Sequence, residues 1–228
     1  MDVVRAAGVL GEVVVRTRGQ PPVVELIVNG AFVMDTAETS TETLLAESAL
    51  EHHDNPSRVL VGGLGLGLTA AAVVADPRVR DVVVAEIEPE LVRLLRGGEL
   101  ARLVPSSAAV SSDARCRVVV GDVVDLARQA SGWDIVLLDV DNGPGFLIHD
   151  RNAGLYTPET LGTLADGLND DGVLAVWSSD THPPLHTALG RVVGPTREVH
   201  RTVTRQGREI EYVIYLARRA NGRTGQPQ

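Results

Sequence analysis

The sequence is poor in cysteine and in aromatic residues, and it has no long apolar run. One cysteine, Cys116, stands among 228 residues, which excludes an internal disulfide and a zinc site built from several thiolates. No apolar stretch has the length that a membrane-spanning helix needs, and no basic segment followed by a short apolar one opens the chain as a signal peptide would. We therefore expect a protein of the reducing cytoplasm, without a membrane partner.

Positive charge is also scarce. The chain carries 21 basic and 30 acidic residues, which gives a net charge of −9 at neutral pH. Because proteins that bind nucleic acids usually present a basic surface to the phosphates, this balance argues against a nucleic-acid partner. The length suits one sizeable domain with a small appendage, and a hydrophobic content of 44% allows an ordinary buried core.

Short apolar runs come first along the chain. The segments "EVVVRT", "VVELIV" and "AFVM" predict strands, and Asn29-Gly30 between the last two predicts a tight hairpin turn. Residues 41–53 carry leucines and alanines at helical spacing and predict a helix.

From residue 58 onward, apolar runs alternate with helix-like stretches. Continuous apolar strands of this kind are typical of a parallel sheet that helices cover on both faces. The expected strands are 58–61, 82–85, 117–120, 135–138, 173–176, 199–204 and 210–216. The expected helices are 69–75, 89–96, 123–129 and 158–168.

This order predicts an α/β fold with a doubly wound, mostly parallel sheet. A C-terminal antiparallel hairpin ends the sheet, and a small N-terminal β unit precedes it. We expect the N-terminal unit over 1–50, the main domain over 51–218 and a disordered polar tail over 219–228.

The first strand of the main domain runs into "GGLGLG", which places four glycines within six residues. In doubly wound sheets, ligands bind beyond the carboxyl ends of the strands, and the first strand–turn–helix is the usual cradle. Glycines there let backbone N–H groups approach a ligand without an intervening Cβ. A tight turn alone would need one or two glycines, so this cluster favours a nucleotide-like ligand.

Carboxylates mark the ends of the next three strands. They are Glu86, Asp122, Asp139 and Asp141. A carboxylate after the second strand accepts hydrogen bonds from ribose hydroxyls. The pattern Gly65-x-Gly67-x-x-Ala70 also meets a relaxed dinucleotide fingerprint, which keeps an NAD-dependent oxidoreductase as an alternative. An adenosyl-sulfonium ligand would use the whole series of carboxylates, so the series favours S-adenosyl chemistry, and we expect no metal.

These motifs occur in the order and at the spacing of a known family. Over residues 23–218 the chain resembles the spermidine synthase (polyamine aminopropyltransferase) family, within the Rossmann-like methyltransferases. The likeness lies in "NPSRVLVGGLGLGLT", "VVVAEIEPELV", "RVVVGDVVDL", "WDIVLLDVDNGPG" and "GLYTPET". The resemblance implies S-adenosylmethionine or its decarboxylated form as the donor, a small-molecule acceptor with amines among the candidates, and a homodimer.

Carried over position by position, the resemblance assigns roles to single residues. The cofactor-binding set is Gly63, Gly65, Gly67, Glu86, Ile87, Asp122, Val123 and Asp139. In this set the glycines line the sulfonium site, the residues after the second strand hold the ribose, and those after the third hold the adenine.

Catalysis and acceptor binding fall on a second group of residues. Asp139 matches the first aspartate of the family's Asp-Ser-(Ser/Thr)-Asp loop, which helps to deprotonate the attacking amine. The second loop aspartate falls on Asn142, and the adjacent Asp141 could replace it after a shift of one residue. The catalytic set is Asp139 and Asp141. The substrate set is Glu47, Asn142, Tyr156 and, after the fifth strand, Asp180.

The sequence departs from the family at several places. The aspartate of the family's GGGDG loop, which pairs with the amine of decarboxylated S-adenosylmethionine, falls on Leu66. The family's Tyr-His-Glu falls on Leu45-Ala46-Glu47, so that only the glutamate remains, and a hairpin glutamine falls on Val33. Loss of the loop carboxylate removes a repulsion against intact S-adenosylmethionine, and it removes a charge-assisted hydrogen bond to the decarboxylated form worth about 1.5–3 kcal/mol.

Two transfer reactions follow from these departures. The expected function is methyl transfer to a small acceptor that the residues do not identify, and aminopropyl transfer is the alternative. A further alternative is a degenerate member that binds the nucleoside without turnover. In either reaction Asp139 would act as a base or hold a cation.

Overall fold

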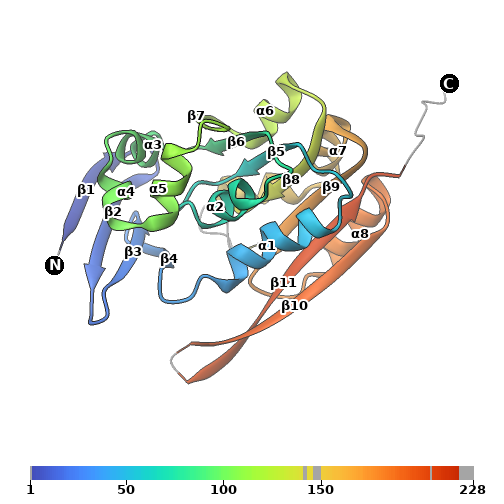
Figure 1. The fold of residues 1–228 in the computed structure, drawn as a ribbon. Coiled ribbons are helices and arrows are strands. Elements are labelled where there is room, and N and C mark those ends of the chain that lie inside the picture. Colours follow the sequence, from blue (N-terminus) through green and yellow to red (C-terminus); the bar gives the residue numbers. More distant parts are fainter. Residues whose placement is uncertain (1, 141–142, 146–149, 206, 221–228) are drawn as a thin grey trace.

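The computed structural model describes residues 2–140, 143–145, 150–205 and 207–220. A central sheet runs through the molecule with helices on both faces, and a smaller sheet lies at one end (Figure 1). Two residues of the expected site, Asp141 and Asn142, lie outside the described residues. None of the described helices has the length and apolar character needed to cross a membrane.

Seven strands of the described chain form the central sheet. They are β5 (Arg58–Gly62), β6 (Asp81–Glu86), β7 (Cys116–Val120), β8 (Trp133–Leu138), β9 (Leu168–Ser178), β10 (Thr196–Arg205) and β11 (Arg208–Arg218). Their spatial order is β10-β11-β9-β8-β5-β6-β7. The strands from β5 to β9 pair in parallel, whereas β11 pairs antiparallel with both β9 and β10. The expected doubly wound α/β fold with its C-terminal hairpin is therefore confirmed.

Two apolar cores lie on the two faces of this sheet. Side chains alternate between the faces of a strand, so Val59 and Val61 join one core and Leu60 joins the other. The first core includes side chains from α1 (Ser40–Glu51), α2 (Leu68–Ala75), α3 (Pro89–Arg96), α4 (Glu99–Leu103) and α5 (Pro105–Ser112). The second includes α6 (Val123–Gln129), α7 (Pro158–Gly167) and α8 (Pro183–Val192), and a 3-10 helix, η1 (Asp150–Tyr156), precedes α7.

The small N-terminal sheet is confirmed as well. Its strands are β1 (Val3–Gly8), β2 (Gly11–Arg18), β3 (Val23–Val28) and β4 (Ala31–Asp35), paired antiparallel in that order. Val28 pairs with Ala31 across Asn29-Gly30, so the expected hairpin turn is also confirmed. The sequence did not predict β1, whose residues alternate between exposed and half-buried positions and include two alanines. The division at residues 50 and 51 stays a prediction.

Three α-helices of the described chain, α4, α5 and α8, were not predicted, and neither was the 3-10 helix η1. In α8 the two prolines occupy the first turn, and the Leu185 N–H donates to Nδ1 of His182 at 3.2 Å. Proline is tolerated there because the first amides of a helix have no partner within the helix. The other two helices are short, and α5 is rich in serine and alanine, so neither shows an apolar period.

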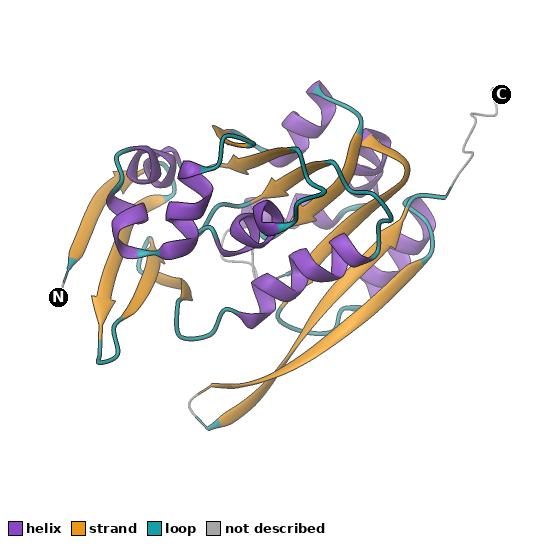
Figure 2. Cartoon of the chain, viewed as in Figure 1, coloured by secondary structure: helices purple, strands orange, loops and turns teal. Residues whose placement is uncertain are grey.

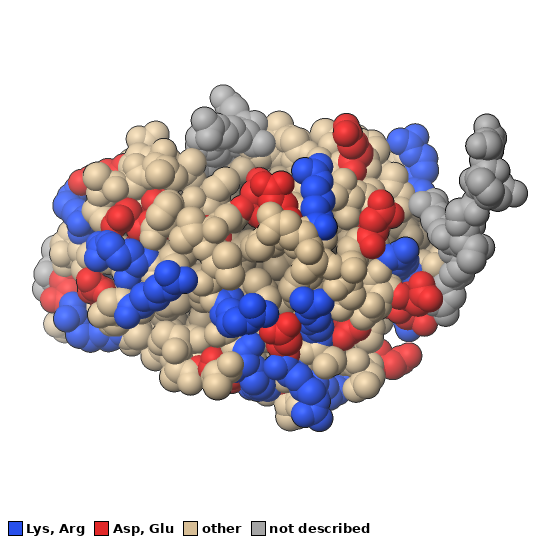
Figure 3. Space-filling view, turned by 90° about the horizontal axis from the view of Figure 1, so that it is seen from above, with Lys and Arg blue, Asp and Glu red and all other residues tan. Residues whose placement is uncertain are grey.

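The hairpin of β10 and β11 extends past the helices that cover the sheet (Figure 2). Seen from above, basic and acidic side chains intermingle on the surface, and neither sign forms one continuous patch (Figure 3). The sequence contains no lysine, so every basic side chain in this view is an arginine.

Candidate active site

A cavity of about 530 Å³ lies at the carboxyl ends of β5, β6, β7 and β8. One part of its wall is the main chain after β5, together with residues that follow the other three strands. Another part comes from the N-terminal sheet, which contributes Leu26, Val28, Val33 and Met34. This is the place where doubly wound sheets bind ligands. The cavity thus joins polar strand ends to an apolar wall.

Two glycines after β5 bring bare main chain to the cavity. Gly63 has a φ of +95°, and its N–H donates to the Ala85 carbonyl at 2.8 Å. A Cβ on Gly63 would overlap the carbonyl oxygen of Asp139, and one on Gly65 would overlap the sulfur of Met34. Both glycines line the cavity. Because these glycines have no side chains, the loop can pack closely against Asp139 and Met34, and its backbone remains accessible to a ligand in the cavity.

The next two residues of the loop lie elsewhere. Gly67 is the N-cap of α2 and packs against the Ser107 backbone of α5, and its φ of +77° is a left-handed conformation that favours glycine. Leu66 is fully buried in the core, and its carbonyl accepts hydrogen bonds from the hydroxyls of Ser106 and Ser107 at 2.7 and 2.9 Å. Neither residue is part of the lining. The Leu66 side chain is therefore not in a position to affect a donor in the cavity, contrary to what the sequence had led us to expect.

Glu86 ends β6 and lies in the cavity wall. It is 7% exposed, and its two carboxylate oxygens accept the N–H groups of Leu64 and Glu88, each at 2.8 Å. Burial raises the pKa of Glu86, and these backbone hydrogen bonds oppose the rise. A carboxylate has about four acceptor positions, so it can accept a ligand hydroxyl group beside the backbone amides. Ile87 follows in the lining and is 44% exposed.

Asp122 and Val123 come directly after β7, and both line the cavity. Asp122 caps α6: its Oδ1 accepts the Val124 N–H at 2.7 Å. This cap fixes the carboxylate at the helix N-terminus, where the helix dipole also favours its negative charge. Val123 is buried and presents an apolar surface beside it.

Asp139 follows β8 and completes the row of strand-end carboxylates. Its Oδ2 accepts a hydrogen bond from Thr69 Oγ1 at 2.6 Å, and Thr69 lies in the first turn of α2. Asp139 touches the cavity, but protein surrounds it so closely that loss of hydration raises its pKa to about 6, against the opposing effect of Thr69. At neutral pH the carboxylate is therefore ionised and can accept a proton.

Two residues of the expected substrate set lie near the cavity without lining it. Tyr156, half-buried at the end of η1, packs against the second core, whereas its neighbour Leu155 lines the cavity. Asp180 is exposed, and its backbone carbonyl accepts the Ser178 hydroxyl at 2.8 Å. A Cβ on Gly145 would meet the Asp180 carboxylate, which therefore faces the segment that follows β8.

The α1 carboxylate that lines the cavity is not the one in the expected substrate set. Glu47 is exposed and lies outside the lining, whereas Glu42 is 8% exposed and lines the cavity. The two positions are five residues apart, which corresponds to a rotation of about 140° around a helix. Glu42 precedes the buried Leu45 and Ala46 by three and four residues, so helical spacing alone places it on the buried face. That spacing is the signal which could have identified it.

Acidic side chains dominate the polar part of the lining. The described lining contains one basic residue, Arg128, whose Nη1 lies 3.5 Å from Asp125 Oδ1. Such a cavity favours a cationic ligand, because confined carboxylates create a negative potential. The carboxylates are Glu42, Glu86, Glu88, Asp122, Asp125 and Asp139.

Glu88 attaches the N-terminal hairpin to this site. It is 1% exposed, caps α3 through the Glu90 N–H at 3.1 Å, and accepts the N–H of Leu10 at 2.9 Å. Leu10 lies in the turn between β1 and β2 and lines the cavity. The carboxylate thus holds an apolar residue from the β1–β2 turn at the cavity wall, close to Glu86.

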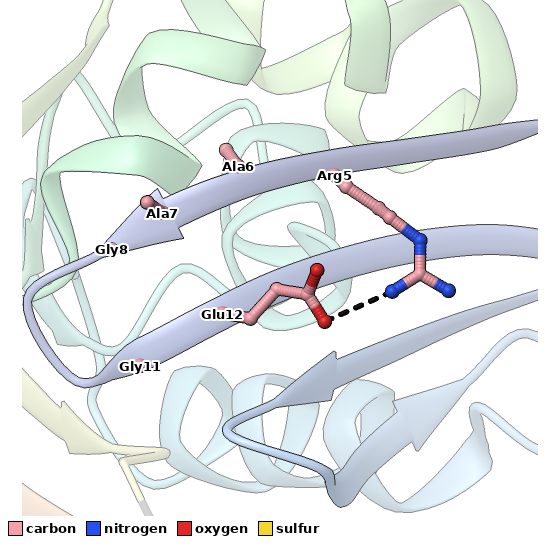
Figure 4. A pocket seen from close by; sticks show the side chains of 6 residues that line it. All are labelled: Arg5, Ala6, Ala7, Gly8, Gly11 and Glu12. Atoms are coloured by element: carbon pink, nitrogen blue, oxygen red, sulfur yellow. Dashed lines mark hydrogen bonds and ion pairs between the residues drawn. The ribbon is translucent and has the colours of Figure 1, made fainter.

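A second hollow, of about 450 Å³, lies on the β1–β2 hairpin (Figure 4). Arg5 and Glu12 point toward each other across the two strands, with Nη1 and Oε2 2.9 Å apart. The other lining residues are alanines and glycines. The two charged groups are exposed and bind each other, so the hollow offers little to a charged ligand.

Comparisons with known proteins agree with this architecture. Residues 38–213 match the family model described as the spermine/spermidine synthase domain. The chain is 32% identical over 179 residues to a polyamine aminopropyltransferase 2 of Pseudomonas aeruginosa, which covers 74% of this chain and 48% of that protein. It is 30% identical over 154 residues to a polyamine aminopropyltransferase 1 of Hyperthermus butylicus, which covers 63% of this chain and 50% of that protein. The chain spans about half the length of the curated relatives it matches.

Solved structures show the same fold. A spermidine synthase in complex with the transition-state analogue AdoDATO superimposes with a TM-score of 0.80 at 17% identity, over 96% of this chain and 74% of that one. Spermidine synthase from Thermotoga maritima gives a TM-score of 0.77 at 16% identity, over 96% of this chain and 72% of that one.

The expectation of methyl transfer is wrong. The curated relatives are named polyamine aminopropyltransferases, and the structural neighbours are spermidine synthases. The expectation depended on the missing carboxylate at Leu66, yet this side chain is buried in the core, outside the lining. A departure at that position therefore says little about which donor the cavity accepts.

Proposed function

Since this chain belongs to the spermine/spermidine synthase domain family, we propose that it transfers the aminopropyl group of decarboxylated S-adenosylmethionine to an amine. The acidic cavity at the strand ends supports this proposal most directly. The decarboxylated donor carries a sulfonium and an ammonium group and no carboxylate. Intact S-adenosylmethionine would bring a carboxylate into a lining that contains six carboxylates and a single arginine among the described residues.

In this proposal the ribose, the adenine and the sulfonium group of the donor bind at the ends of different strands. Glu86 accepts hydrogen bonds from the ribose hydroxyls, with Ile87 packed against the nucleoside. Asp122 accepts from the adenine amino group, and Val123 contacts the ring. The bare backbone of Gly63 lies beside the sulfonium end, next to Asp139. This assignment uses the cavity residues at the ends of four successive strands of the sheet.

Asp139 takes up the proton that the reaction releases. An amine acceptor is an ammonium ion at neutral pH, and one proton of its reacting nitrogen passes to the Asp139 carboxylate, which frees an electron pair on that nitrogen. The nitrogen then attacks the propyl carbon attached to sulfur, and the carbon–sulfur bond breaks with its electron pair left on sulfur, which gives neutral methylthioadenosine and a secondary ammonium product. Thr69 holds that carboxylate in place at 2.6 Å, and the raised pKa of about 6 makes Asp139 a better base than an exposed aspartate.

The expected result of a direct assay is an aminopropylated product. Wild-type protein is incubated with decarboxylated S-adenosylmethionine and 1,4-diaminobutane, and the products are identified by mass spectrometry. We expect methylthioadenosine and the diamine extended by one aminopropyl group, in equal amounts. Intact S-adenosylmethionine in a parallel reaction should yield no methylated amine. Methylation there, or no transfer from either donor to any amine of a panel, would contradict the proposal.

A further inference from the structure

Glu42 lies in the cavity wall close to the reacting end of the proposed site. It is 8% exposed, and Thr41 Oγ1 donates to its Oε2 at 2.6 Å. The Thr69 hydroxyl lies 2.6 Å from Asp139 Oδ2 and 3.4 Å from the backbone carbonyl of Glu42. One hydroxyl group therefore spans the two residues and places Glu42 beside Asp139 at the same end of the cavity.

The surroundings of Glu42 suit a cation on a short alkyl chain. A buried carboxylate loses hydration, and a bound cation offsets that loss. Glu42 lies in the first turn of α1, where the helix dipole favours its ionised form. Val33 and Met34 from the N-terminal sheet add an apolar surface to the same cavity. Carboxylate and apolar wall together match an alkylammonium group.

A purely structural role for Glu42 is the competing explanation. Glu42 follows Thr39, the N-cap of α1, by three residues, which is the spacing of a capping box. The Thr39 side chain, however, makes no capping hydrogen bond. A capping box also works with glutamine in place of glutamate. A change from glutamate to glutamine therefore removes the charge and preserves any capping.

We propose that Glu42 binds a primary alkylammonium group of a reactant and makes the site specific for reactants that carry one. The inference rests on the proposed aminopropyl transfer, in which both the donor and a diamine acceptor have such a group. It also explains how a chain with an apolar, buried residue at Leu66 can still offer a carboxylate at the reacting end: α1 supplies it.

The test compares Glu42→Gln with Glu51→Gln, an exposed change at the end of the same helix. Calorimetry measures the affinity for decarboxylated S-adenosylmethionine and for methylthioadenosine, which lacks the ammonium, and steady-state kinetics gives the Michaelis constant for the diamine acceptor, 1,4-diaminobutane. For Glu42→Gln we expect either the affinity for the decarboxylated donor to fall or the Michaelis constant for the diamine to rise, in each case by roughly 10- to 100-fold, because a charge-assisted hydrogen bond is lost. Weaker binding of the decarboxylated donor, with methylthioadenosine unchanged, assigns the ammonium to the donor. A raised Michaelis constant for the diamine, with donor binding unchanged, assigns it to the acceptor.

Two outcomes would overturn the inference, and they are separable. If the wild type binds the donor and forms product but Glu42→Gln changes neither quantity, Glu42 does not bind an ammonium and the proposed function stands. If the wild type itself neither binds the donor nor forms product, the proposed function fails and the inference fails with it. Urea denaturation of each variant checks that the fold is retained.

Discussion

Replacing Asp139 by asparagine is expected to lower kcat by roughly 10²- to 10⁴-fold, the usual contribution of a positioned general base. An asparagine side chain can still accept the Thr69 hydrogen bond through its oxygen, so the local structure should persist. It cannot take up a proton. Affinity for uncharged methylthioadenosine should stay close to that of the wild type, because in the proposal Asp139 acts at the reacting end rather than on the ribose or the base. Single-turnover kinetics with saturating decarboxylated donor and 1,4-diaminobutane measures the effect.

The matched control for this experiment is Asp166→Asn, an exposed position in α7 that does not line the cavity. It should keep the wild-type rate. A wild-type rate in Asp139→Asn would instead show that the proton leaves by another route, and the assignment of Asp139 would be wrong.

The pKa of Asp139, about 6, adds a second signature to the same experiment. An alkylamine titrates near pH 10 and therefore reaches the site as an ammonium ion, so log(kcat/KM) should stay level between about pH 6 and 9. Below about pH 6 it should fall with slope 1, because protonated Asp139 cannot take up the ammonium proton. Asp139→Asn should lose this break. Folding raises the pKa of Asp139 from 3.8 to about 6, so ionisation of this carboxyl group lowers the stability of the fold as the pH rises through that range. Asparagine cannot ionise, and Asp139→Asn should therefore not destabilise the protein at neutral pH through loss of charge.

Glu86→Gln is expected to weaken nucleoside binding by roughly 10- to 100-fold, because charge-assisted hydrogen bonds to the ribose become neutral ones. The two carboxylate oxygens also accept the amides of Leu64 and Glu88, and an amide NH2 group would meet one of these donors. We therefore expect the ligand-free variant to lose about 1–3 kcal/mol of stability as well. Calorimetry with methylthioadenosine measures the affinity, since this probe has the ribose and lacks the ammonium.

Glu159→Gln, an exposed change in the first turn of α7, serves as the control for Glu86→Gln. Its affinity for methylthioadenosine should match the wild type. Urea denaturation separates a folding defect from a binding defect. Unchanged affinity in a folded Glu86→Gln protein would remove Glu86 from the ribose site and leave it with only its hydrogen bonds to the loop.

The sequence was sufficient for the central sheet and for three of the six carboxylates in the described cavity lining. Runs such as Val59-Leu60-Val61 predict strands buried on both faces, and the structure sends these side chains to two separate cores. Parallel strands end at one edge, so Glu86, Asp122 and Asp139 had to lie near the glycine loop once the strand order was known. These predictions succeeded because they depend on local periodicity and on a general property of the fold.

The remaining features depend on contacts between distant segments. Gly65 packs against Met34 of the N-terminal sheet and Gly67 against α5, which the sequence did not predict, and both have a positive φ, +49° and +77°, that favours glycine. Glu42 was missed because the motif was placed on Glu47, and only the helical face separates the two. The buried position of Leu66 likewise depends on α5, whose serines bind its carbonyl.

One titration tests most directly whether the acidic cavity selects a donor that carries positive charge and no carboxylate. The affinities for decarboxylated and intact S-adenosylmethionine are measured side by side with wild-type protein at low salt, where screening is weakest. The account predicts clearly tighter binding of the decarboxylated form. Equal or tighter binding of intact S-adenosylmethionine would contradict it.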